Sequence, residues 1–264
     1  MKFDRHYLGD RRQDLRRIIS YFLFGLGNTM IKNRELTQSI KDKYSGRRAF
    51  VVCNGPSLRA ADLDIIYQNK DLSIASNKID KIFPFTKWRP TFYTIMDQGY
   101  QYKLLDTMNA VPAELKVFRQ ESYYYTKRVK GTSIYVDTRV KGSTVYEPLF
   151  FEDISEHLAA VSTVTYAMFQ ILVHLGIREI YIIGCDNSYG REKQKDGTIV
   201  EKGGPSYFQG SNPKDNQIAA DVWQMTETYK YARKYADEHN IIIKNATRGG
   251  FLEEFERVDF DSLF

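Results

Sequence analysis

Short apolar runs alternate with longer helical patterns over most of the chain, from Arg47 onward. A strand buried on both faces has a continuous apolar sequence, and helices between such strands form the crossovers of a parallel sheet. We expect strands at 48–53, 72–76, 91–96, 115–118, 132–136, 179–184 and 240–244. The predicted fold class is therefore α/β, a Rossmann-like open, mostly parallel sheet with helices on both faces.

The first 45 residues differ from this pattern, and we expect a helical extension (1–45) before the Rossmann-like domain (46–264). Four arginines within residues 11–17 precede the apolar run 18–26. This run is shorter than the ~20 residues that a membrane-spanning helix needs, and no small-residue cleavage site of a signal peptide follows it. We expect the helix either to pack on the domain or on a second copy of the chain, or to lie in the plane of a membrane with its arginines at the lipid headgroups.

Two long helices are predicted in the second half of the domain. Apolar residues at three- and four-residue spacing predict a helix over 162–175, and another is expected over 213–238, with Asn212 as N-cap and Pro213 in its first position. The segment 186–211, which precedes the second helix, is too long and too rich in glycine for a simple connection. Its aromatic residues favour a long lid loop that orders on binding over a disordered segment.

The composition excludes several classes of protein. With 264 residues, of which 42% are hydrophobic, the chain can bury a full core. A net charge of +5 favours anionic ligands or an acidic membrane face but is too small to indicate a nucleic-acid partner. The two cysteines, Cys53 and Cys185, form neither a disulfide framework nor a zinc-site spacing. We expect a cytoplasmic protein, peripheral at the inner face of the membrane if the extension binds lipid.

The first predicted strand ends in a turn that suits a phosphate. The apolar residues 50–53 are followed directly by Asn54-Gly55-Pro56-Ser57. Gly55 lets the backbone approach a ligand closely, Pro56 starts a helix, and Ser57 offers a hydroxyl beside unpaired N–H groups. The turn lacks the spacing of GxGxxG or of a P-loop, so a plain connecting turn is the alternative interpretation.

Polar side chains follow five of the predicted strands at the point where each strand ends. In an open α/β sheet, ligands bind outside the carboxyl ends of the strands. The residues at these positions are Asn54, Asn77, Asp97, Asp186 and Asn245. Asparagines can contact a base or a ribose, while the two aspartates can hold Mg²⁺ or accept a proton. This edge of the sheet is therefore the predicted site.

The predicted helix that begins at Ser162 and Thr163 brings two hydroxyls and free N–H groups to the same edge, where a pyrophosphate can bind. Of the four histidines, His157 is the one whose position allows it to approach this edge and act as a base.

Several of these motifs occur together in two known families. They are Asn54-Gly55-Pro56-Ser57-Leu58, then Ser76-Asn77, then Ser162-Thr163-Val164, and finally the segment from Leu175 through Ile180-Tyr181-Ile182-Ile183-Gly184-Cys185-Asp186. This ordered set, within residues 47–258, resembles the bacterial family-42 sialyltransferases, which use CMP-sialic acid. It also resembles the MptE-like family, named for archaeal 6-hydroxymethyl-dihydropterin pyrophosphokinase.

The resemblance implies roles for individual residues. Asn54 to Ser57 and Asn77 would surround the nucleotide, and Ser162 and Thr163 would lie near its phosphate or the sugar carboxylate. Tyr189 and Tyr207 would match the two tyrosines that sialyltransferases place on the phosphate of CMP. The sialyltransferases also carry a catalytic histidine before the last long helix, and residues 207–213 of this chain contain none. Asp97 and the segment 245–250, which begins with Asn245, are closer to the MptE-like pattern.

The resulting expectation is a glycosyltransferase, sialyltransferase-like, that acts in cell-surface polysaccharide or glycoprotein biosynthesis. Its partners would be a nucleotide-activated sugar, with CMP as the nucleotide that the resemblance suggests, and a glycan or glycolipid acceptor. The candidate bases are Asp186, Asp97 and His157, in that order, and no cofactor is required. The alternatives are an ATP-dependent pyrophosphokinase with Mg²⁺ held by Asp97 and Asp186, and a non-catalytic nucleotide-binding subunit.

Overall fold

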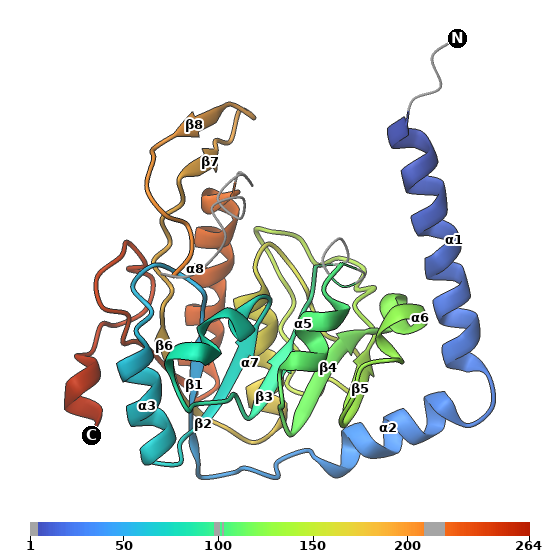
Figure 1. Cartoon of the computed structure of the whole chain (residues 1–264), viewed down its shortest axis with the longest axis horizontal. Coiled ribbons are helices and arrows are strands. Elements are labelled where there is room, and N and C mark those ends of the chain that lie inside the picture. The colour runs from blue at the N-terminus through green and yellow to red at the C-terminus, as the bar shows by residue number, and fades with distance from the viewer. Residues whose placement is uncertain (1–4, 98–100, 102, 209–219) are drawn as a thin grey trace.

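The computed structural model describes residues 5–97, 101, 103–208 and 220–264. Within these residues, seven parallel strands form one sheet in the order β5-β4-β3-β2-β1-β6-β9 (Figure 1). The strands are β1 (Arg48–Val52), β2 (Leu72–Ser76), β3 (Phe92–Thr94), β4 (Leu115–Arg119), β5 (Ser133–Val136), β6 (Glu179–Ile183) and β9 (Ile242–Asn245). Each strand overlaps one of the predicted runs, so the predicted α/β fold is confirmed.

The order of the strands changes direction beside β1. The chain moves outward from β1 through β2, β3 and β4 to β5, and then crosses to β6 on the other side of β1. Consecutive crossovers therefore leave β1 and β6 toward opposite sides of the sheet. This is the topological switch point, where α/β proteins of this kind bind their ligands.

Helices cover both faces of the sheet because alternate residues of each strand point to opposite faces. Val51 of β1 belongs to the core on one face, and the neighbouring Phe50 belongs to the core on the other. The first face is covered by α7 (Val164–His174), α8 (Val222–Glu238) and α2 (Thr29–Ser39). The second face is covered by α3 (Ala60–Gln68), η1 (Ile79–Phe85), α5 (Leu105–Ala110), α6 (Tyr123–Thr126) and η4 (Phe260–Leu263).

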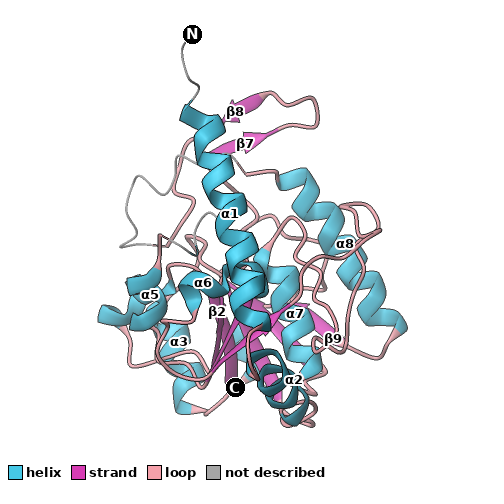
Figure 2. Cartoon of the chain, turned by 90° about the vertical axis from the view of Figure 1, so that its right-hand side faces the viewer, coloured by secondary structure: helices cyan, strands magenta, loops and turns pink. Residues whose placement is uncertain are grey.

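The N-terminal segment forms α1 (Arg5–Gly25) and α2, which meet at an angle beside β5 (Figures 1 and 2). Asn33 of α2 pairs with the edge strand: its Nδ2 donates to Tyr135 O (2.9 Å), and its Oδ1 accepts from Tyr135 N (2.7 Å). An exposed edge strand presents unpaired backbone groups, so this side chain takes the place of a further strand. Part of the extension is thus built into the sheet.

The predicted lid loop, residues 186–211, is described as far as Phe208 and is not entirely irregular. It contains an antiparallel hairpin of β7 (Arg191–Lys193) and β8 (Ile199–Glu201), which projects beyond the sheet in Figure 1. The helix predicted over 213–238 is wrong at residues 220 and 221, which precede α8. Ala220 is extended beside β7, where its carbonyl accepts from Lys193 N (2.9 Å), and the helix begins at Val222. The predicted cap at 212–213 lies outside the described residues.

Replacing Asn33 with Ala removes both hydrogen bonds to β5 and leaves two backbone groups of the edge strand unpaired. We expect the Asn33→Ala protein to lose about 1–3 kcal/mol of unfolding free energy, measured by urea denaturation. Gln38→Ala on the exposed side of the same helix is the matched control, with an expected change below about 0.5 kcal/mol. Equal stability of the two variants would show that the edge strand does not depend on Asn33.

Candidate active site at the switch point

A cavity of about 100 Å³ lies at the carboxyl ends of β1, β2 and β6. Its lining comes from the turns after these strands, from the start of α7, from the segment that follows the hairpin and from α8. The lining residues are 53–55, 76–77, 163–165, 184–187, Ser188, Tyr189, Ser206, Tyr207 and Tyr229. The cavity therefore occupies the switch point, as the positions of the polar strand-end residues predict.

The turns after β1 and β6 are held against each other by hydrogen bonds. Gly55 N donates to Gly184 O (2.8 Å), and both N and Oγ of Ser57 donate to Asp186 Oδ2 (3.2 and 2.8 Å). A Cβ atom on Gly55 would collide with Asp186 Oδ2 and would lie 2.6 Å from Gly184 O. Glycine is required at this position because the neighbouring turn occupies the space of a side chain.

Asp186 is the carboxylate of the cavity, and only 7% of its surface is exposed. Burial raises its pKa above the ordinary value near 3.8, because desolvation disfavours the charged form, while the hydrogen bonds from Ser57 act in the opposite direction. The net effect is a carboxylate with a raised pKa. A raised pKa makes it a better proton acceptor near neutral pH than an exposed aspartate is.

Three asparagine side chains present unpaired oxygens at the cavity. Asn54 Nδ2 donates to Ser76 O (3.1 Å), and this bond determines the orientation of the amide. The Oδ1 atoms of Asn54, Asn77 and Asn187 are buried and have no hydrogen-bond partner among the described residues. Leaving buried acceptors unpaired is costly, so each of them calls for a donor from beyond the described residues. Hydroxyls of a ribose and the amino group of a base are donors of this kind.

The N-terminus of α7 points its first residues at the same cavity. Thr163 is the N-cap, and its side chain accepts a hydrogen bond from Thr165 N (3.3 Å). Ser162 has a positive φ of 45°, which turns the chain into the helix. Thr163, Val164 and Thr165 line the cavity, so the partial positive charge of the helix end lies where a phosphate can bind.

Two thiols and a buried tyrosine form one wall of the cavity. Cys53 Sγ lies 3.5 Å from Thr165 Oγ1, and Cys185 Sγ lies 3.5 Å from the hydroxyl of Tyr229. A hydrogen bond between the two thiols lowers the pKa of Cys53 and raises that of Cys185. Burial raises the pKa of Tyr229, so its hydroxyl stays protonated as a donor.

Tyr229 was not among the residues expected from the sequence to contribute to the site. Its place in the apolar stripe of α8 indicates core packing, and its ring is indeed buried. The hydroxyl, however, reaches Thr163 Oγ1 (3.3 Å) as well as Cys185. The sequence signal for this role was a tyrosine, with its polar hydroxyl, in an otherwise apolar face of the helix.

The chain on either side of the hairpin folds back over the cavity. Tyr189 and Tyr207 both line it, and the hydroxyl of Tyr189 donates to Met225 Sδ of α8 (3.5 Å). Phe208 is 2% exposed, and its N–H donates to Asn54 O (3.0 Å). The two tyrosines thus lie at the switch point, and Phe208 joins this segment to the turn after β1.

The remaining predicted residues lie next to the cavity or away from it. Pro56, Ser57 and Ser162 adjoin its lining without belonging to it. Asn245 is used by the C-terminal segment, because its Nδ2 donates to Leu252 O (2.7 Å) and its Oδ1 accepts from Thr247 N (3.0 Å).

His157 lies near the far edge of the sheet. Its ring packs against Phe151, with centroids 5.8 Å apart, and it is close to Asp137, which follows β5. The strands β4, β3 and β2 separate this position from β1. The structure does not bring His157 to the cavity.

Asp97 and Asp186 do not fit a shared metal ion. They follow β3 and β6, which are three strand spacings apart, or roughly 14 Å. Asp97 is exposed, while Oδ2 of Asp186 already accepts two bonds from Ser57. The described part of the chain contains no group of three or more His, Cys, Asp or Glu side chains placed to hold a metal.

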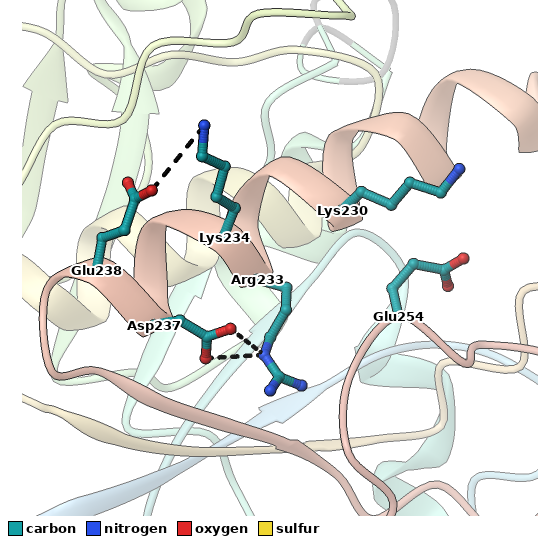
Figure 3. Close-up of a pocket in the computed structure, with 6 residues that line it drawn as sticks. All are labelled: Lys230, Arg233, Lys234, Asp237, Glu238 and Glu254. Atoms are coloured by element: carbon teal, nitrogen blue, oxygen red, sulfur yellow. Dashed lines mark hydrogen bonds and ion pairs between the residues drawn. The ribbon is translucent and has the colours of Figure 1, made fainter.

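A larger depression of about 350 Å³ lies along α8, away from the switch point. Figure 3 shows that its charged side chains pair along the helix: Arg233 with Asp237 at 2.8 Å, and Lys234 with Glu238 at 3.9 Å. Exposed pairs four residues apart on a helix are typical of a solvated face. We therefore place the site at the smaller cavity.

The raised pKa of Asp186 gives a pH-dependent prediction. An acid with a higher pKa in the folded state binds more protons folded than unfolded, so the unfolding free energy falls as the pH rises above about 3.8. We expect Asp186→Asn to lack this loss, so its stability relative to the original protein should increase between about pH 4 and pH 7. Urea denaturation across this range measures the difference. Ser57→Ala, which removes one hydrogen bond to the carboxylate, should steepen the loss, and parallel pH profiles for all three proteins would contradict the assignment.

Comparison with known proteins agrees with this architecture. Residues 27–192 match the family described as 6-hydroxymethylpterin diphosphokinase MptE-like. Among solved structures, the chain is similar in fold to the MAf glycosyltransferase from Magnetospirillum magneticum AMB-1, with a TM-score of 0.55 and 16% sequence identity. This similarity covers 91% of the present chain and 40% of that protein, so the chain spans less than half of its length. No curated protein sequence matches the chain. Because the family match covers more than half of the chain and includes the turns after β1 and β6, the protein belongs to the MptE-like family.

Proposed function

We propose that the protein is a nucleotide-sugar-dependent glycosyltransferase whose nucleotide binds in the cavity at the switch point. The observation that carries the proposal is the set of three buried, unpaired carboxamide oxygens on Asn54, Asn77 and Asn187, in a part of the structure where the described residues supply no donor. A nucleoside brings hydroxyl and amino donors, and its phosphate suits the nearby N-terminus of α7. The fold shared with a glycosyltransferase and the family match support a transferase.

The proposed reaction is a direct displacement at the anomeric carbon of the donor sugar. Asp186 takes the proton of the acceptor hydroxyl, the acceptor oxygen bonds to the anomeric carbon, and the bond from that carbon to the phosphate oxygen breaks. The negative charge on the leaving phosphate is stabilised by the start of α7 and by the hydroxyls of Tyr189 and Tyr207. Asp97 and His157 rank below Asp186 as bases because they lie farther along the edge of the sheet.

The donor proposed is a CMP-linked sugar, and the acceptor a glycan or glycolipid of cell-surface assembly. Cytosine carries an exocyclic amino group, which is the kind of donor that an unpaired asparagine oxygen accepts. The cavity itself, at about 100 Å³, is smaller than typical ligand pockets. The sugar is therefore proposed to extend out of the cavity beneath Tyr207.

A second candidate is an ATP-dependent pyrophosphokinase, which the description of the matching family favours. In that case Asp186 would hold Mg²⁺ together with phosphate oxygens of the substrate, since Mg²⁺ is often bound by one or two carboxylates. The ion would neutralise charge on the transferred group. A non-catalytic nucleotide-binding subunit is the third interpretation.

Removing the asparagine oxygens should weaken nucleotide binding. We expect Asn54→Ala and Asn77→Ala each to reduce the affinity for CMP about tenfold or more, since each loses a buried hydrogen bond to the ligand. Calorimetry with CMP and with ATP plus Mg²⁺ measures the affinities and separates the two candidate functions. Asn69→Ala, an exposed asparagine that contacts Ile65 O at the end of α3, is the control. Affinities that equal the control for both nucleotides would refute a nucleotide site at the cavity.

Replacing Asp186 should affect turnover far more than binding. Asp186→Asn keeps the size of the side chain but removes its charge, so we expect nucleotide affinity to survive and turnover with the identified donor to fall about a hundredfold or more. Activity that persists in EDTA assigns Asp186 as a base, and activity lost in EDTA assigns it as a metal ligand. Near-normal turnover of the variant would exclude both roles.

A further inference from the structure

Helix α1 is attached to the domain by one of its faces. Phe24 is 3% exposed and packs against the rings of Tyr123 and Tyr135, with centroids 5.3 and 5.8 Å apart. Ser20, one turn earlier, is fully buried and accepts a hydrogen bond from Tyr124 N (3.1 Å). These contacts determine which side of the helix faces the protein.

The opposite side of α1 carries large apolar residues that remain exposed. Leu15, Ile18 and Phe22 follow one another at intervals of three and four residues, so they form a stripe along the helix. Their exposed fractions are 57%, 65% and 66%, and the chain beyond the helix adds exposed Leu26, Met30 and Ile31. In Figure 2, which views the molecule from the side where α1 lies, the helix is in front of the domain and uncovered by other elements. A contiguous exposed apolar surface marks an interaction site.

The charge of the protein is concentrated in this same region. Residues 1–45 contain ten Lys or Arg and five Asp or Glu, a net charge of +5. The whole chain contains 38 basic and 33 acidic residues, so residues 46–264 contain 28 of each and are neutral. The entire positive excess therefore belongs to the segment that carries the apolar stripe.

We propose that α1 docks on the surface of an anionic membrane, lying in its plane with Leu15, Ile18 and Phe22 inserted among the lipids. An exposed apolar stripe on a positively charged segment is the pattern of an interfacial helix, and each Lys or Arg near an anionic surface raises the affinity roughly fivefold. Pairing with a second copy would bring two segments of net charge +5 together. Among the described helices, none is long and apolar enough to cross a bilayer. Docking through α1 is independent of the reaction at the cavity.

Co-sedimentation of the full chain with lipid vesicles tests this proposal. We expect the protein to bind vesicles of equal parts phosphatidylcholine and phosphatidylglycerol, and to bind pure phosphatidylcholine at least tenfold more weakly. High salt should weaken the binding to anionic vesicles. The double variant Ile18→Ser, Phe22→Ser should bind at least tenfold more weakly than the original chain, because it loses most of the apolar surface that inserts.

Phe85→Ser is the matched control, because Phe85 is 61% exposed and lies in η1, which follows β2 and not the edge strand β5. This variant should bind like the original chain, and the circular dichroism spectra of all three proteins should agree. Binding that is equal on both kinds of vesicle, or unaffected by the double variant, overturns the proposal. A dimer in light scattering that the double variant dissociates, without vesicle binding, assigns the stripe to a second copy instead, and a monomer that binds no vesicles also overturns it.

Discussion

The contact between the turns after β1 and β6 is the constraint on which the site depends. Gly55 has no side chain, so its backbone can approach Gly184 and Asp186 closely enough for the hydrogen bonds from Gly55 and Ser57 to form. These bonds hold the carboxylate of Asp186 beside the turn that follows β1. They also bring Asn54, from the turn after β1, and Asn187, from the turn after β6, to the same cavity.

Some polar groups around this contact have hydrogen-bond partners within the described residues, and others have none. The carboxylate of Asp186 accepts a hydrogen bond from Ser57, and the hydroxyl of Tyr229 contacts Thr163 and Cys185. The side-chain oxygens of Asn54, Asn77 and Asn187 have no hydrogen-bond partner within the described residues. The cavity therefore combines a positive helix end, a carboxylate of raised pKa and unsatisfied acceptors. Functional sites commonly tolerate such costs, which a bound ligand removes.

The two helices of the N-terminal segment are attached to the domain in different ways. Its second helix completes the edge of the sheet through Asn33, while the first packs on the domain through the side that carries Ser20 and Phe24. Leu15, Ile18 and Phe22 of α1 are turned outward. The family match begins at residue 27, so it includes α2 and leaves α1 outside.

The sequence by itself determined the strands, because strands buried on both faces need short, mostly apolar runs, and here such runs alternate with helical patterns. It also placed polar residues at one edge, since parallel strands all end on the same side of a sheet. Only the tertiary structure decided which of these ends meet. The strand order brings Asn54 and Asn77 together with Asp186, but leaves Asp97 and His157 beyond β3 and β5. Strand order depends on contacts between distant segments, which local patterns do not encode. For the same reason the packing of α8, rather than its sequence, brought the hydroxyl of Tyr229 to the cavity, and the docking of Phe24 turned the apolar stripe of α1 outward.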